Sequence, residues 1–222
     1  MIPCLYYEVL DLPLHELETK LLLLVEWQSQ NTQLHQTLKI LVSRNARFDS
    51  VCKKIEEKAP LELKRGIVLF EVVESKISRV VARSCPASTK LTGTLVAQEV
   101  RPEEADKQEG DRLLCVSHAY GGPDALLAPR PFGRPFRCLW RKDEPFQVVR
   151  ERIRLRLELS VEAMEDWKCV IVHYKDRTVV ADTDKQTQFT WGIHTFLALN
   201  HPNPHARSST SRGPQKGIQI HG

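Results

Sequence analysis

Two cysteine–histidine pairs are the first places to look for chemistry in this sequence, because a thiol protease needs both side chains within hydrogen-bond reach. Cys115 and His118 are three residues apart on a predicted strand, so their side chains are expected on opposite faces. Cys169 and His173 share a face of another predicted strand, but at strand rise they lie about 13 Å apart. We therefore expect neither pair to transfer a proton.

Two pairs of possible metal ligands are also present. Asp182 and Asp184 form one pair, and His201 and His205 form the other, but no further ligand of suitable spacing accompanies either. We interpret all four as polar loop residues. The sequence also has no phosphate-binding glycine loop, so we expect no metal, no cofactor and no active site in this chain.

The last residues, 216–222 (KGIQIHG), are the strongest candidate for a binding segment. Ile218 and Ile220 would face one way in an extended chain, with Gln219 and His221 facing the other. Residues 207–214 (RSSTSRGP) precede them and are typical of a flexible linker. The pattern predicts a peptide that docks on another surface, and the alternative is a disordered terminus.

The charge distribution argues against a nucleic-acid partner. The 222-residue chain carries a formal net charge of +4, and every acidic residue lies at or before Asp184. The excess is carried by Lys185, Arg207, Arg212 and Lys216. A neutral body with a mildly basic tail lacks the clustered Lys and Arg of a phosphate-binding face.

The six cysteines are widely spaced and mostly lie in apolar runs, which favours buried free thiols in a reducing compartment. The longest apolar run, residues 21–25, is far too short to cross a membrane, and no signal peptide is evident. We expect a nuclear or cytoplasmic protein with no membrane partner.

Hydrophobic periodicity predicts an α+β chain with two successive series, each with a helix between strands. The first series consists of strands at 20–28 and 33–42, a helix at 48–58, and strands at 67–73, 76–81, 95–100 and 113–118. The second consists of a strand at 135–140, a helix at 146–157, and strands at 167–174, 178–181 and 195–199. Strand, strand, helix, strands is the order of a β-grasp.

One segment supports two interpretations. Residues 152–159 (RIRLRLEL) alternate strictly, as in a strand, while Phe146, Val149, Ile153 and Leu157 form a stripe at helical spacing. We predict a helix, because a second β-grasp requires one here. The four arginines at 150, 152, 154 and 156 are expected to form a solvated face.

Gly121 and Gly122 follow the first series and raise the possibility of a conjugated ubiquitin-like modifier. The preceding residues lack a basic run, and Pro123 is poorly suited to a cleavage site. We interpret the Gly/Pro-rich stretch 121–131 as a domain linker instead. The predicted organisation is a connector at 1–18, domains at 19–120 and 132–200, and a flexible tail at 201–222.

Five motifs occur in an order that resembles the extreme C-terminal region of the herpesvirus-associated ubiquitin-specific protease (HAUSP) family and its plant relatives. They are LYYEVLDLPL at 5–14, FGRPF at 132–136, WKCV at 167–170, LALNH at 197–201 and KGIQIH at 216–221. The resemblance implies two tandem ubiquitin-like β-grasp domains, followed by a tail that docks on a cysteine-protease domain and activates it.

Carried over by residue, the resemblance places Ile218, Ile220 and His221 in the activating tail. Leu5, Tyr6, Tyr7 and Leu10 would belong to the connector, which we expect to pack against a neighbouring domain of a longer protein. Residues 182–191 match the family poorly, and the linker is richer in Ser and Thr than in relatives.

Three functions are compatible with these observations. The first is a non-catalytic regulatory region of a deubiquitinase, whose partner is a ubiquitin-specific protease catalytic domain in cis or in trans. The second is a stand-alone ubiquitin-like interaction module that binds other proteins through its β-grasp surfaces. The third is a hydrolase in its own right, which the cysteine–histidine spacings argue against.

Overall fold

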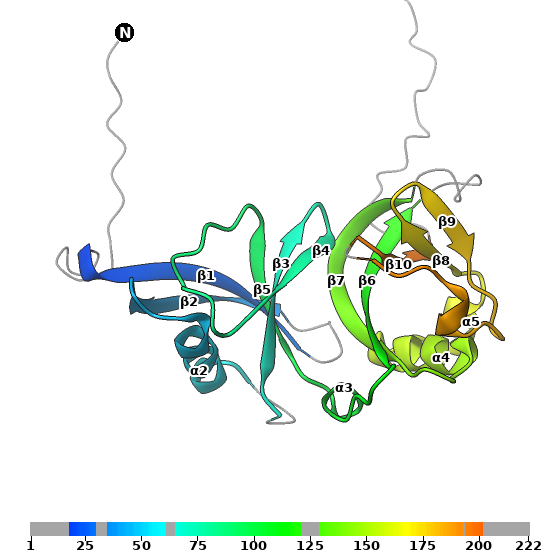
Figure 1. Ribbon diagram of the computed structural model, residues 1–222, viewed down its shortest axis with the longest axis horizontal. Helices are drawn as coiled ribbons and strands as arrows, with labels where there is room; N and C mark the ends of the chain where they lie inside the picture. Colours follow the sequence, from blue (N-terminus) through cyan, green and yellow to red (C-terminus); the bar gives the residue numbers. More distant parts are fainter. Residues whose placement is uncertain (1–17, 30–34, 61–64, 121–128, 193, 202–222) are drawn as a thin grey trace, which may run out of the picture.

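The computed structural model describes residues 18–29, 35–60, 65–120, 129–192 and 194–201, and within them the chain forms two five-stranded sheets (Figure 1). The first sheet contains β1 (Lys20–Gln28), β2 (His35–Ser43), β3 (Ile67–Val73), β4 (Lys76–Val81) and β5 (Thr94–Glu99). The second contains β6 (Arg112–Tyr120), β7 (Arg130–Trp140), β8 (Lys168–His173), β9 (Asp176–Val179) and β10 (Phe196–Asn200). The helices are α2 (Phe48–Lys58), α3 (Pro102–Ala105), α4 (Phe146–Arg156) and α5 (Val161–Glu165), and a short 3-10 helix covers Gln186–Gln188.

Both sheets have the same topology. The first has the order β2-β1-β5-β3-β4 and the second the order β7-β6-β10-β8-β9. In each, the first and last strands pair in parallel and the other neighbours are antiparallel, with Val25 opposite Leu95 and Val116 opposite Leu197. The predicted α+β class is therefore confirmed.

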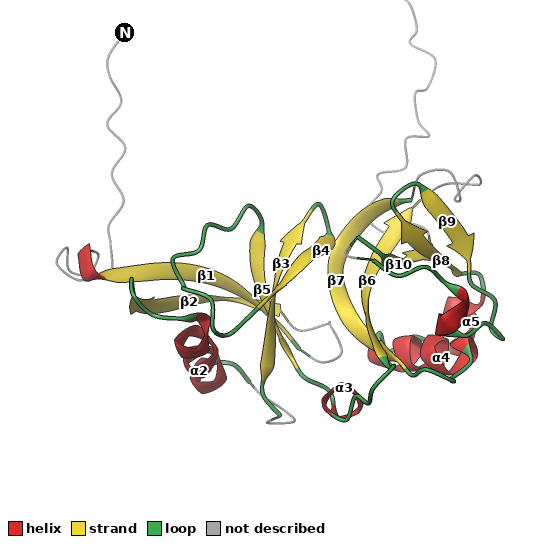
Figure 2. Cartoon of the chain, in the orientation of Figure 1, coloured by secondary structure: helices red, strands yellow, loops and turns green. Residues whose placement is uncertain are grey.

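Each sheet has its own core, beneath α2 in the first sheet and beneath α4 and α5 in the second (Figure 2). Phe48, Val51, Cys52 and Ile55 of α2 are fully buried, as their helical spacing predicts. Asp49 and Lys53 pair on the outer face at 3.0 Å, also as predicted. Phe146, Val149 and Ile153 of α4 are buried in the same way against the second sheet.

The ambiguous segment is a helix, so the helical stripe outweighs the alternation of its arginines and leucines. Helix α4 ends at Arg156, and Glu158 has a φ of 53°, a left-handed conformation that stops the helix from continuing. The predicted solvated arginine face is wrong. The side chains of Arg150, Arg152 and Arg154 are only 27%, 18% and 20% exposed, and the largest departure is Arg156, at 1%. That residue lies on the fourth buried position of the helix and pairs with Glu104 of α3 at 3.2 Å.

One predicted strand belongs to the other sheet. The strand predicted at 113–118 was expected in the first domain, but β6 pairs with β7 and β10 in the second sheet. The first sheet has no central position left for it, because β5 already lies between β1 and β3.

The predicted domain linker is also misplaced as a consequence. Residues 121–128 lie outside the described residues, but β6 and β7 on either side of them pair antiparallel in one sheet. This stretch therefore connects two strands of a single sheet. The connection from β5 of the first sheet to β6 of the second runs through residues 100–111 and carries α3.

The two sheets meet where β4 lies against β6 and β7 (Figure 1). Arg134 of β7 pairs with Glu26 of β1 at 3.4 Å. The backbone N–H of Arg137 in β7 donates to the buried side chain of Gln98 in β5 at 3.3 Å. Polar contacts thus join the two sheets directly.

No described helix is long and apolar enough to cross a membrane.

Candidate functional site at the end of the second sheet

The residues predicted to carry function at the two ends of the chain lie outside the described residues. They are Leu5, Tyr6, Tyr7 and Leu10 of the connector and Ile218, Ile220 and His221 of the tail. Their roles stay predictions. What the structure does describe is the place from which the tail starts, His201 at the end of β10.

Each histidine of the two cysteine–histidine pairs makes its hydrogen bond to another residue. The Nδ1 atom of His118 lies 2.9 Å from Nε2 of His201, and Nδ1 of His173 lies 2.7 Å from Oγ1 of Thr195. Burial raises the pKa of the Cys115 thiol, and it raises the pKa of Cys169 to about 12. Neither thiol has the lowered pKa that a reactive cysteine needs.

The aspartates considered as metal ligands have structural contacts. Asp182 pairs with Arg150 at 3.3 Å, and a side-chain oxygen of Asp184 accepts from the N–H of Ala181 at 2.8 Å. The described residues contain no group of three or more His, Cys, Asp or Glu side chains placed to hold a metal ion. His205 lies outside them.

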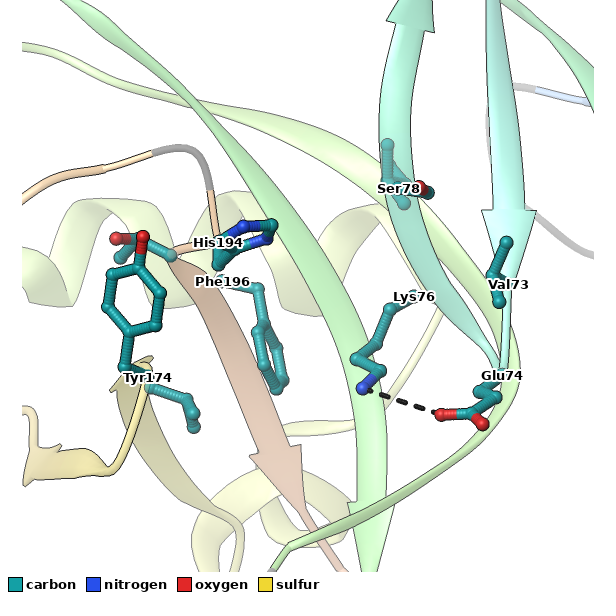
Figure 3. Close-up of a pocket in the computed structure, with 10 residues that line it drawn as sticks. Val73, Glu74, Lys76, Ser78, Tyr174, His194 and Phe196 are labelled. Atoms are coloured by element: carbon teal, nitrogen blue, oxygen red, sulfur yellow. Dashed lines mark ion pairs between the residues drawn. The ribbon is translucent and has the colours of Figure 1, made fainter. Parts of the chain in front are cut away.

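A groove of about 350 Å³ opens between the two sheets (Figure 3). One wall is the β3–β4 hairpin, with Val73 and the pair Glu74–Lys76, whose charged atoms are 3.8 Å apart. The other wall contains Tyr174, His194 and Phe196, and the ring centroids of Tyr174 and His194 are 5.3 Å apart. Its mixture of apolar and aromatic side chains suits binding of another apolar side chain.

Three of the five motifs behind the family resemblance converge on one aromatic cluster. Phe132 and Phe136 come from β7, Trp167 precedes β8, and His201 follows β10. The rings of Trp167 and His201 stack in parallel, with centroids 3.7 Å apart and planes inclined by 4°. Phe132 meets His201 edge-on at 5.1 Å. The motifs could be recognised in the sequence, but the contact between their aromatic rings was not predicted.

His118 of β6 completes this cluster, which we call the histidine cluster (His118, Phe132, Phe136, Trp167 and His201). Burial, reinforced by the neighbouring His201, lowers the pKa of His118 to about 4, so this imidazole is neutral at physiological pH. A neutral ring can accept or donate one hydrogen bond to its neighbour across the 2.9 Å contact. From its spacing to Cys115, His118 was predicted only as a possible catalytic base, because its ring partners lie far from it in the sequence.

The backbone of His201 is held as well. Its N–H donates to the carbonyl of Ala119 at 3.0 Å, which continues the parallel pairing of β10 with β6 by one residue. A ring stack, a side-chain hydrogen bond and a backbone hydrogen bond thus fix this residue. The arrangement is suited to fixing the point where the second sheet ends, and none of its groups forms an acid–base pair with a nucleophile.

Comparison with known proteins decides the family. The family model described as "Ubiquitin-specific protease C-terminal" matches residues 4–206, nearly the whole chain. The chain belongs to this family. The resemblance inferred from the five motifs is therefore confirmed.

Similar proteins are longer members with this region as a part. The chain is 24% identical to ubiquitin carboxyl-terminal hydrolase 7 of Drosophila melanogaster over 98% of its length and 20% of the fly protein's. It is 26% identical to ubiquitin C-terminal hydrolases 12 and 13 of Arabidopsis thaliana, over 89% and 81% of its length. The chain spans no more than about a fifth of the relatives it matches.

The ubiquitin-specific protease C-terminal match includes the whole histidine cluster and ends five residues beyond His201. The predicted docking residues Ile218, Ile220 and His221 lie after that limit, although the alignment with the fly relative covers 98% of the chain.

Proposed function

We propose that this chain is the non-catalytic regulatory C-terminal region of a HAUSP-like deubiquitinase. Its terminal residues dock on the cysteine-protease domain and stabilise a competent active site. The observation that carries the proposal is the family match over residues 4–206 in a chain that covers only a fifth of its fly relative. Ile218 and Ile220 are the anchors of the docking peptide, and the compartment is the nucleus or the cytoplasm.

The topology supports the architectural part of the proposal. Ubiquitin-like β-grasp domains have a five-stranded mixed sheet of order 2-1-5-3-4 with a helix after the second strand, and the same strand order occurs twice in this chain. We propose two tandem ubiquitin-like domains whose boundary lies in residues 100–111. Leu5, Tyr6, Tyr7 and Leu10 would then form a connector that packs on a preceding domain.

The test is to add the chain in trans to the catalytic domain of a ubiquitin-specific protease of this family and to follow cleavage of a ubiquitin–fluorophore substrate. The proposal expects turnover to rise with the added chain and expects the Ile218→Ala/Ile220→Ala variant to lose that effect. Gln219→Ala is the matched control, because its side chain would face away from the docking surface. Turnover that is unchanged by the chain, or equally changed by all three proteins, would contradict the proposal.

A second candidate is an interaction module without a protease partner. The groove between Val73, Tyr174 and Phe196 favours it, because an open groove with both apolar and polar walls suits a side chain of another protein. Partners recovered with the chain would never include a ubiquitin-specific protease in that case, and their binding would be lost in Tyr174→Ala but kept in the Ile218→Ala/Ile220→Ala variant.

A further inference from the structure

The four outer strands of the two sheets are not equally protected. A strand at the edge of a sheet has backbone groups that point away from its neighbour and can pair with another chain. In the first sheet, the carbonyls of Lys39 and Leu41 on β2 accept hydrogen bonds from Lys58 and Lys54 of α2. The other edge, β4, lies against the second sheet.

The edge formed by β7 is protected in the same way. The carbonyls of Arg137 and Leu139 accept hydrogen bonds from Arg156 and Arg152 of α4. The N–H of Arg137 donates to Gln98 of the first sheet. In both sheets, cationic side chains of the helix therefore donate hydrogen bonds to the outer edge of the strand before that helix, β2 before α2 and β7 before α4.

Strand β9 is the exception. The N–H of Val180 donates to the carbonyl of Cys169 on β8. Because backbone groups alternate along an antiparallel strand, those of Thr178 also face β8, while the N–H and carbonyl groups of Arg177 and Val179 face away from the sheet. Among the described residues, no hydrogen bond reaches the outward N–H or carbonyl of Arg177 or Val179. Val179 is also apolar and 46% exposed. Figure 1 shows β9 at the margin of the second sheet.

We propose that the chain's own residues 216–222 pair with β9 as an additional strand when they are not bound elsewhere. This inference rests on the proposed function, because it gives the docking tail a resting site that competes with the protease. Binding of an extended segment to a free sheet edge supplies backbone hydrogen bonds, and alternate side chains supply the specificity.

The reach of the tail supports this occupant. Ile218 comes seventeen positions after His201, and a flexible chain of that length has an r.m.s. span of about 23 Å. Strand β9 is two strands from β10, about 10 Å across the sheet. Val179 is level with Ala198 along the sheet, because both pair with Val170. Ala198 comes only a few residues before His201, where the tail starts, so the free edge is level with the start of the tail.

The side chains are also compatible. Val179 shares a face of the sheet with its cross-strand partner Val170, and Ile218 and Ile220 can lie together on that face of an added strand. The tail has no acidic residue, and its Lys216 can approach the exposed Asp176 at the start of β9. A tail paired in cis is held back from the catalytic domain, so the fraction of free tail sets how readily the chain activates it.

Amide hydrogen exchange of the full chain tests the contact directly. The amides of Arg177 and Val179 should exchange more slowly in the full chain than in a chain that ends at residue 206, and a tail paired half of the time gives about a twofold slowing. Ile218→Ala/Ile220→Ala should abolish the slowing, and Gln219→Ala should keep it. Equal exchange in all four proteins would overturn the proposal. Slowing that grows with protein concentration would also overturn it, since the tail of a second copy would then be the occupant.

Val179→Pro links the contact to function. It removes the outward N–H but no hydrogen bond of the β8–β9 ladder, and an edge strand tolerates proline at such a position. With its melting temperature unchanged, this variant should activate the catalytic domain at a lower concentration than the wild type, by the same factor as the exchange slowing. An unchanged half-activating concentration alongside slowed exchange would overturn the competition with the protease. If no protein activates the domain, the proposed function fails, while the exchange result still decides the contact.

Discussion

The two sheets share one topology but bury their charges in different ways. In the first sheet, the buried carboxylate of Glu71 pairs with Arg79 of β4 at 2.7 Å and accepts hydrogen bonds from Thr92 and Gly93. All of these groups belong to the first sheet and its loops. In the second sheet, the buried Arg156 of α4 pairs with Glu104 of α3, on the connection between the sheets.

The difference shows which sheet depends on its neighbour. Both side chains of the Arg156–Glu104 pair are almost fully buried, and within the described residues Oε2 of Glu104 and Nε and Nη2 of Arg156 lack hydrogen-bond partners. Burial raises the pKa of Glu104 and lowers that of Arg156, because desolvation penalises each charge. The guanidinium also lies 4.7 Å above the ring of Phe136. The second sheet is thus completed by the inter-sheet connection, whereas the polar site of the first is self-contained.

The largest expected effect is at Arg156. Replacing it with alanine leaves the carboxylate of Glu104 buried without its partner, which costs about 3–5 kcal/mol in the free energy of unfolding. Urea denaturation of the purified chain measures this loss. Arg154→Ala on the same helix is the control. It removes a hydrogen bond to the carbonyl of Leu159, but its partner Glu151 is 51% exposed and stays hydrated, so the loss should be smaller.

A double variant separates a buried charge from a lost contact. Arg156→Met with Glu104→Leu removes both charges and fills similar volume, so it should recover most of the stability lost in Arg156→Ala. Equal losses in Arg156→Ala and Arg154→Ala would contradict the idea that the second sheet depends on this pair.

The sequence predicted local structure well where one face of an element is buried. The predicted ends of four elements agree with the structure to within one residue: α2, α4, β3 and β4. Their periodicity could be read from the sequence because it reflects the core beneath them. The assignment of β6 to the first sheet was wrong, because the sequence of a strand does not determine which other strands it pairs with. A glycine- and proline-rich stretch is also equally suited to a hairpin and a domain linker, so 121–131 was misread.

Partners far apart in the sequence explain the other misses. Arg156 looked like one of four solvated arginines, because Glu104 lies 52 residues earlier and Arg137 lies on a neighbouring strand. The motifs containing Phe132, Trp167 and His201 were recognised singly, but their convergence on His118 requires the strand order. The docking roles of Ile218, Ile220 and His221 stay predictions.

The self-contained site of the first sheet makes a prediction about acid. Burial raises the pKa of Glu71, but hydrogen bonds from the N–H groups of Gly93 and Thr92, the Thr92 hydroxyl and Arg79 outweigh this and lower it to about 2, from 4.5. A carboxyl whose pKa is lower in the folded state contributes stability above pH 4.5 and loses it as the pH falls towards 2.

Glu71→Gln should therefore destabilise the chain by about 1.5–3 kcal/mol at neutral pH, because hydrogen bonds to a charged acceptor are lost. The difference between wild type and variant should shrink as the pH is lowered from 5 to 2. Urea denaturation at pH 6 and pH 3 measures both quantities. A difference that stays constant over this range would show that Glu71 is not held as a carboxylate by its hydrogen bonds.

The smallest expected effect compares two glycines, each just before the last strand of its sheet. A Cβ atom on Gly93 would lie 2.1 Å from the carbonyl oxygen of Val72, so the backbone of the first sheet would have to move. A Cβ atom on Gly192 would lie 2.8 Å from Cε1 of His173, a side-chain atom at the end of β8 that can rotate away. Gly93→Ala should cost about 1–3 kcal/mol in the free energy of unfolding, as overpacking does. Gly192→Ala should cost less, because relaxation of His173 and the lower entropy of the unfolded chain offset the contact. Equal losses in urea denaturation would show that both sheets tolerate a Cβ atom equally well just before their last strands.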